Sequence, residues 1–152
     1  MKKYLFFLAL LLIGSCQNCS NSNVNDSSMR LIESFEYYDL LKNKTILVIP
    51  NAGCEGCITS AESFTVENFE ISNKIAFVFT NISSTKILKG KLGADVYFHQ
   101  NVYIDSLNHF YSGELMNIYP VILYQKNNRV VKTVEVSPIN LSALDSLQST
   151  IF

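Results

Sequence analysis

Two short stretches of the chain are apolar at nearly every position and rich in β-branched or aromatic residues. They are TILVIP at residues 45–50 and KIAFVFT at residues 74–80. A strand with one wet face alternates apolar and polar side chains, whereas a strand buried on both faces is apolar throughout. We therefore expect two buried strands in the interior of a sheet.

Four other segments place apolar residues at helical spacing. They are residues 30–44, residues 57–69, where the pattern is weak, residues 83–93 and residues 139–152. The third begins with serines that are candidate N-caps and ends at Gly93, a usual helix stop. The last segment is amphipathic, and its apolar residues are Leu141, Leu144, Leu147 and Ile151.

The clearest local signal lies in PVILYQKNNRVVKTVEV, residues 120–136. Two β-rich runs flank Asn127-Asn128, and asparagine tolerates the positive φ angles of a tight hairpin turn. Pro138 then ends the second strand, and alternation at residues 102–104 suggests a further short strand upstream. The order of strands and helices predicts an α/β domain with a parallel core and an antiparallel C-terminal hairpin.

The N-terminus has a different pattern, that of an export signal. Two lysines precede an almost wholly apolar run at residues 4–13, and Gly14-Ser15 follows. The run is shorter than the ~20 residues that a helix needs to span a bilayer, and this layout is typical of a secretory signal peptide. We assign residues 1–15 to the signal peptide.

The end of this segment, Ile13-Gly14-Ser15-Cys16, resembles the bacterial lipobox, in which an aliphatic residue and two small residues precede a cysteine that is acylated. Carried over by position, Cys16 becomes the lipid-bearing first residue of the mature protein. An ordinary signal peptide that happens to end near a cysteine is the alternative. Residues 16–28 are small and polar, as in a flexible tether, and the domain is expected at residues 29–152. We expect a bacterial cell envelope location, with a lipid anchor in the membrane and the domain in the periplasm or otherwise outside the cytoplasm.

Length and charge exclude some classes of function. The 152 residues suit one ordinary domain, and a formal net charge of −1 with 16% charged residues offers no basic surface for nucleic acid. No phosphate-binding loop, serine triad or paired-carboxylate site occurs, and His99 and His109 have no partner motif beside them. Asp105 suits either a turn or the lining of a site, and we expect the turn.

The remaining candidate chemistry lies in the segment NAGCEGCITSAE, where Cys54 and Cys57 follow a predicted buried strand. A structural disulfide here would close a loop too small to constrain the unfolded chain much. A zinc site would need a second pair such as Cys16 and Cys19, and an acylated Cys16 has no free thiolate. Because disulfides persist in exported compartments, we favour a redox pair and expect no metal.

Three features in this order resemble the thioredoxin-like superfamily, particularly its membrane-tethered bacterial members. A buried strand leads into Cys54-Glu55-Gly56-Cys57 at the start of a helix, Tyr119-Pro120 stands directly before a strand, and a β-hairpin and a C-terminal helix follow. The resemblance covers residues 45–152 and is more specific than a lone CxxC. It implies a thioredoxin-like fold, with a mixed central sheet, flanking helices and the CxxC at a helix N-terminus.

The resemblance also implies a role for each of these residues. Cys54 would attack a disulfide from the helix start, where N–H groups and the helix dipole favour thiolate, and Cys57 would resolve the mixed disulfide. Pro120, in cis, would lie against the pair, and the backbone of Tyr119 would bind an extended substrate. The implied protein is a monomeric thiol-disulfide oxidoreductase that needs a redox partner but no cofactor and acts on protein or small-molecule thiols and disulfides.

The chain departs from the family pattern at several positions. Gly53 stands where a tryptophan commonly precedes the first cysteine, Val48 aligns with a buried acid often found on the preceding strand, and Glu55-Gly56 replaces Gly-Pro. The spacing to Pro120 is long, which suggests an insertion at residues 95–117. The alternative function is a non-catalytic module that keeps the fold and holds a partner protein. A peroxidase relative is a third possibility. It would need a polar threonine or an arginine near the attacking cysteine, and the sequence around Cys54 offers only Asn51 and Thr59.

Overall fold

The computed structural model describes residues 33, 35–40, 45–71, 74–111 and 118–151. The predicted signal peptide, the tether and both N-terminal cysteines lie outside these residues. In chain order the elements are β1 (Thr45–Pro50), α2 (Glu55–Asn68), β2 (Ile75–Thr80), α3 (Thr85–Leu92), α4 (Ala94–Tyr97), β3 (Val102–Ile104), β4 (Val121–Lys126), β5 (Arg129–Glu135) and α5 (Ser142–Ile151).

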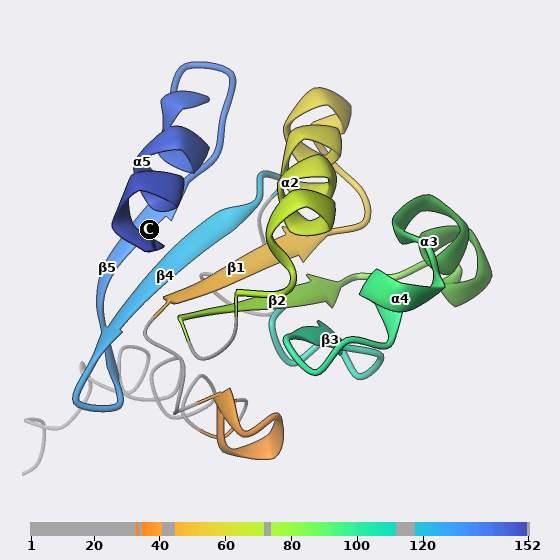
Figure 1. Cartoon of the computed structure of the whole chain (residues 1–152), viewed down its shortest axis with the longest axis horizontal. Coiled ribbons are helices and arrows are strands. Elements are labelled where there is room, and N and C mark those ends of the chain that lie inside the picture. Colours follow the sequence, from red (N-terminus) through yellow and green to blue (C-terminus); the bar gives the residue numbers. More distant parts are fainter. Residues whose placement is uncertain (1–32, 34, 41–44, 72–73, 112–117, 152) are drawn as a thin grey trace, which may run out of the picture.

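The strands form one mixed sheet in the order β3-β2-β1-β4-β5 (Figure 1). The pairs β1–β2 and β2–β3 are parallel, whereas β1–β4 and β4–β5 are antiparallel. Leu47 of β1 lies opposite Phe77 of β2 on one side and Ile122 of β4 on the other. All residues of β1 and β2 are buried, which confirms the two predicted interior strands and the α/β class.

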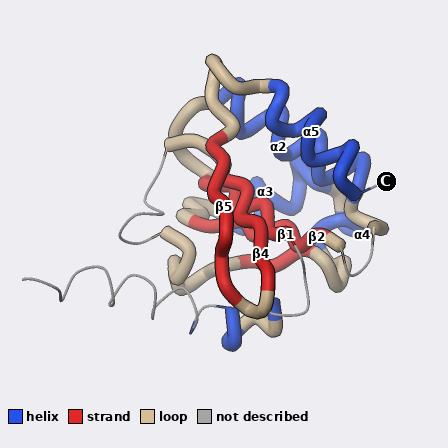
Figure 2. The backbone as a smooth tube through the Cα atoms, turned by 90° about the vertical axis from the view of Figure 1, so that its left-hand side faces the viewer, coloured by secondary structure: helices blue, strands red, loops and turns tan. Residues whose placement is uncertain are grey.

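Different parts of the chain cover the two faces of the sheet. Side chains alternate along a strand, so Leu47 belongs to the core cluster that contains residues of α2, α3, α4 and α5. Its neighbour Val48 packs instead in a second cluster with Phe35 and Phe110. Figure 2 shows α2 and α5 together on one side of the sheet. β1, the strand that leads into the loop before α2, is therefore packed on both of its faces.

The turns and caps that local sequence signals predict are present in the structure. The hydroxyl oxygen of Ser84 accepts a hydrogen bond from the N–H of Ile87 at 3.3 Å, and α3 ends at Gly93, whose φ is 84°. Asn127 and Asn128 have φ angles of 53° and 59°, as the two-residue hairpin turn requires. The predicted hairpin and the short strand β3 are both confirmed.

The structure differs from the sequence-based expectation in three places. The helix α4 was not predicted, because a four-residue helix leaves almost no periodic pattern. Leu141 was expected on the buried side of the last helix, but it precedes α5 and is 51% exposed, whereas Leu144 and Leu147 are buried. Of the helix predicted at residues 30–44, the described part is helical at 33 and 35–37 and turns at 38–39.

Candidate functional site: the disulfide at the start of α2

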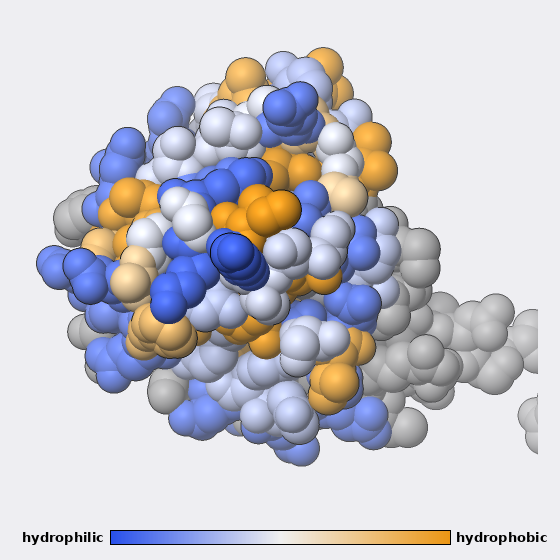
Figure 3. Space-filling model, turned by 90° about the vertical axis from the view of Figure 1, so that its right-hand side faces the viewer, coloured by the Kyte–Doolittle hydropathy of each residue, from blue (hydrophilic) through white to orange (hydrophobic). Residues whose placement is uncertain are grey.

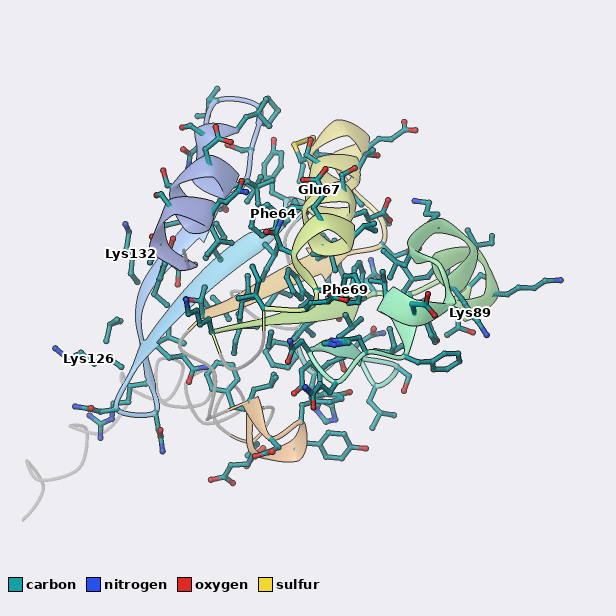
Figure 4. The ribbon with its side chains drawn as sticks, viewed as in Figure 1. Phe64, Glu67, Phe69, Lys89, Lys126 and Lys132 are labelled. Atoms are coloured by element: carbon teal, nitrogen blue, oxygen red, sulfur yellow. A yellow bond between two sulfur atoms is a disulfide. The ribbon has the colours of Figure 1, made fainter. Side chains whose placement is uncertain are left out.

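Cys54 and Cys57 form a disulfide in the first turn of α2. β1 ends at Pro50, a short loop follows, and Cys54 is the N-cap residue of the helix. The two Cα atoms are 5.3 Å apart, a separation typical of bridged cysteines. Figure 4 draws the bridge in yellow beside the first turn of α2. The predicted CxxC position at a helix N-terminus is thus present.

The two sulfur-bearing residues differ in access to solvent. Cys57 is 2% exposed, whereas Cys54 is half-buried and retains contact with solvent. The first-turn N–H groups of a helix have no partner within the helix and carry partial positive charge. After reduction, a second molecule therefore reaches Cys54 first, at a position where the backbone favours thiolate.

Gly53 brings the disulfide loop into contact with the segment before β4. The backbone N–H of Cys54 donates a hydrogen bond to the carbonyl oxygen of Ile118 at 2.8 Å. Gly53 has a φ of 148°, and a Cβ atom at this position would overlap the backbone of Ile118. Only glycine fits such a close approach of two backbones. Sequence reasoning treated Gly53 as a missing tryptophan and did not recognise this contact.

The predicted residues Tyr119 and Pro120 continue from this contact. Pro120 is buried, and its carbonyl oxygen accepts a hydrogen bond from the N–H of Val136 at 2.8 Å, just beyond the end of β5. The segment 118–120 therefore lies between the disulfide loop and the end of β5. The Tyr119–Pro120 peptide is trans, because the described residues contain no cis peptide bond. This corrects the cis bond that the family resemblance implied; trans is the lower-energy form by about 0.5–1 kcal/mol.

The charges near the disulfide are negative. Glu55 is exposed in the first turn of α2, between the two cysteines. The sequence of α2 also contains Glu62 and Glu67 but no lysine, arginine or histidine. On the strand below, Val48 is 3% exposed in an apolar cluster, so this position holds no group that could relay a proton.

Asp105 directly follows β3 and accepts hydrogen bonds from several segments at this end of the sheet, but it does not line the disulfide. It is fully buried, and its carboxylate accepts hydrogen bonds from the hydroxyls of Tyr38 (2.9 Å) and Thr80 (2.8 Å) and from the backbone N–H groups of His109 (3.0 Å) and Phe110 (2.8 Å). Burial, and then the hydrogen bond to Asp105, raise the pKa of Tyr38. Asp105 is thus a structural turn residue, as expected from the sequence.

This buried carboxylate is linked to the base of the disulfide loop. The backbone carbonyl of Thr80, whose hydroxyl donates to Asp105, accepts a hydrogen bond from the N–H of Asn51 at 2.9 Å. Asn51 is the first residue after β1. The loop from Asn51 to Cys54 is therefore held at its base by Thr80 and at its end by Ile118.

The histidines take no part in this site. His99 packs edge-on against Phe69, with ring centroids 5.0 Å apart, and His109 lies near the ring of Tyr37 at 5.1 Å. Both are half-buried, and packing explains their positions. Within the described ranges, no group of three or more histidine, cysteine or carboxylate side chains is arranged to hold a metal ion.

A groove of about 670 Å³ runs along the face of α2 that looks toward α3. Gly53 and Glu55 line one end, Glu67 lines the other, and Lys91 of α3 stands on the opposite wall. Neither cysteine lines the groove, although Cys54 lies between two residues that do. Figure 3 shows the face that carries α3 and α4 as mostly hydrophilic, with separate hydrophobic patches. The groove therefore begins at the residues on either side of Cys54.

No known family model, curated protein or solved structure matches this chain. In the portion that the structure describes, none of the helices has the length and apolar character needed to cross a bilayer.

Proposed function

We propose that this protein is a thiol-disulfide oxidoreductase with a thioredoxin-like fold. The observation that carries the proposal is a disulfide at a helix N-terminus in which Cys54 is accessible and Cys57 is buried. Its contact with Ile118, next to Tyr119-Pro120, supports a substrate-binding role for that segment. The mixed sheet with a C-terminal hairpin and helix supports the fold assignment.

The chemistry needs only the two sulfurs and a second thiol or disulfide. In the reducing direction, the thiolate of Cys54 attacks one sulfur of a substrate disulfide, and the other substrate sulfur leaves as a thiolate. The thiolate of Cys57 then attacks the sulfur of Cys54, which re-forms the protein disulfide and releases the second substrate thiolate. Two electrons pass from the protein dithiol to the substrate, and the reverse steps oxidise a dithiol.

A binding module that holds a partner protein without exchange is the second candidate. The charge of α2 favours it, because Glu55 opposes a thiolate at Cys54 and the helix supplies no cationic side chain to offset this effect. Under this alternative the bridge would keep the loop in shape, and reduction would change stability without supporting turnover.

A trapping experiment separates the two functions. We expect the reduced Cys57→Ser protein to accumulate a mixed disulfide with substrate through Cys54, because the resolving thiol is absent. The Cys54→Ser protein is the control, and both variants also carry Cys19→Ser. The control should trap nothing, since the thiol of Cys57 is buried. Equilibration of the wild type with glutathione buffers, read by thiol alkylation, then gives the reduction potential and the direction of electron flow. A pair that never equilibrates would favour the binding module.

We also propose that the protein is lipid-anchored through Cys16, with its domain outside the cytoplasm. The support is the sequence Ile13-Gly14-Ser15-Cys16 after an apolar run. Metabolic labelling with a clickable fatty acid should label the wild type and the Cys19→Ser control. Cys16→Ser should lose the label and leave the membrane fraction. Equal labelling of both variants would contradict the anchor.

A further inference from the structure

The groove beside the disulfide follows one continuous stripe of α2. Its lining residues on this helix recur at intervals of three and four positions, which places them on one face. They run from Glu55 at the first turn to Glu67 in the last turn. At 1.5 Å per residue these two positions are about 18 Å apart along the helix axis. An extended chain at about 3.3 Å per residue covers that length in about five residues.

Charge in the groove is predominantly negative. The lining contains three carboxylates and one ammonium group. The ammonium of Lys91 contacts both carboxylate oxygens of Glu62, at 3.0 and 3.2 Å, so these two charges compensate each other. Glu55 and Glu67 are both exposed, and neither has an ion pair within the described part of the chain. The two ends of the groove therefore carry uncompensated negative charge.

Three lysines of the described residues lie away from the acidic ends of the groove. The ammonium of Lys89 on α3 lies 4.4 Å from the ring centroid of Phe98, and Figure 4 shows its side chain pointing away from α2. Lys126 and Lys132 lie on β4 and β5, toward the opposite edge of the sheet from β3 and away from α3 (Figure 4). Within the described residues no cation is paired with Glu67, so its carboxylate is open to a cation of a bound molecule.

Between its acidic ends the groove has an apolar floor. Ile58 and Val66 both line it, and Val66 is 40% exposed. Lysine and arginine bury their methylene stems on apolar surface while their charged heads stay in water. A surface with aliphatic side chains beside carboxylates matches both parts of such a side chain.

We propose that this groove binds a basic segment of the substrate protein, with two lysine or arginine side chains about five residues apart. One would meet Glu55 and the other Glu67, with their stems against Ile58 and Val66. Because Glu55 directly follows Cys54 in the chain, the substrate cysteine would flank the first of the two cations. The inference rests on the proposed exchange at Cys54, and it adds the chemical class of the substrate.

A peptide pair tests the binding step without any thiol chemistry. Both fluorescent peptides carry serine in place of cysteine; one has two lysines five residues apart, and the other has glutamines there. Fluorescence anisotropy with the oxidised full-length protein should show the lysine peptide binding at least about fivefold more tightly at low salt. High salt should abolish the difference. Equal affinities for the two peptides at low salt would overturn the proposal.

Two matched variants locate the binding surface. Glu67→Gln removes one carboxylate from the groove, about 15 Å along the helix from Cys57, so it leaves the cysteines untouched. It should lower the affinity for the lysine peptide about two- to fivefold, the effect of losing one surface ion pair. Glu70→Gln, an exposed position outside the groove, makes the same charge change and should have no effect. The same loss in both variants would reject the groove.

The exchange step is measured separately with cysteine versions of the same peptides. Each cysteine is held in a mixed disulfide with 5-thio-2-nitrobenzoate, which leaves as a coloured thiolate when reduced Cys54 attacks the peptide sulfur. Faster release from the lysine peptide would support both proposals. Tight binding of the lysine peptide without release of 5-thio-2-nitrobenzoate would contradict the proposed oxidoreductase activity and support the groove as a binding site for a basic segment. Release at equal rates from both peptides would support thiol-disulfide exchange at Cys54 and contradict the binding of a basic segment in the groove.

Discussion

The N–H of Cys54 donates a hydrogen bond of 2.8 Å to the carbonyl oxygen of Ile118, which joins residues far apart in the sequence. This contact aligns the disulfide loop with the segment that enters β4. Because the N–H of Cys54 itself is engaged in this contact, a thiolate formed on reduction would be stabilised by the free N–H groups of the following residues in the first turn of α2. The contact exists only because Gly53 has no side chain.

Replacing Gly53 with alanine should weaken this junction. The added methyl group would overlap the backbone of Ile118, and φ at 148° is a region that L side chains rarely adopt. We expect a loss of about 1–3 kcal/mol in the free energy of unfolding, measured by urea denaturation of the oxidised protein. Gly90→Ala is the control: its Cβ meets nothing within 4 Å, and alanine inside α3 should add about 0.5–1 kcal/mol.

Asp105→Asn should destabilise the whole domain. The buried carboxylate accepts four hydrogen bonds, and an amide nitrogen in place of one oxygen would face donors. We expect the free energy of unfolding to fall by about 2–3 kcal/mol, again by urea denaturation. Asp95→Asn, at an exposed position in α4, should change it by less than about 0.5 kcal/mol. Similar losses in both variants would contradict the structural role of Asp105.

Glu55→Gln should make the reduced protein more reactive. The carboxylate follows Cys54 directly and disfavours a second negative charge on its sulfur. Removing it should raise the rate of alkylation by neutral iodoacetamide at pH 7 about two- to threefold, in line with a solvent-screened charge interaction. Glu70→Gln, outside the site, serves as the control. An unchanged rate in Glu55→Gln would mean that the backbone alone sets the thiolate fraction.

Tyr38 should make stability depend on pH under alkaline conditions. Burial and Asp105 raise its pKa in the folded protein above the ordinary value of 10.0. The folded state then holds the proton more tightly than the unfolded state, so the stabilisation is complete below pH 10 and is lost as the pH rises above it. Urea denaturation between pH 8 and about 11 should show a shallower decline for Tyr38→Phe than for the wild type. The Tyr37→Phe control, at an exposed position, should decline as steeply as the wild type.

Several parts of the fold could be predicted because their causes are local. A continuously apolar run such as residues 45–50 cannot face water on either side, so its burial as β1 follows from composition alone. The positive φ angles at Asn127 and Asn128 follow from the turn that two close strands require. The place of Cys54 at the start of α2 is what the thioredoxin-like resemblance implies, because the local helical pattern at residues 57–69 is weak.

Other features depend on which segments meet in space. No periodic pattern could reveal that Ile118 lies against Gly53. Nor could one reveal that the carboxylate of Asp105 accepts hydrogen bonds from Tyr38 and Thr80. Each of these contacts joins residues distant in the chain. The groove likewise needs α3 beside α2, with Lys91 opposite Glu62.

The sequence by itself thus determined the two interior strands and the hairpin, since burial and turn geometry act over a few residues. The family resemblance implied the helix N-terminus for the cysteine pair. The tertiary structure alone decided why position 53 must be glycine and where the acidic groove runs. It also makes Cys54 the accessible cysteine, the residue that the resemblance implied would attack. Those properties arise from packing between elements, where close approach and shared hydrogen bonds are set by neighbours that the local sequence does not contain.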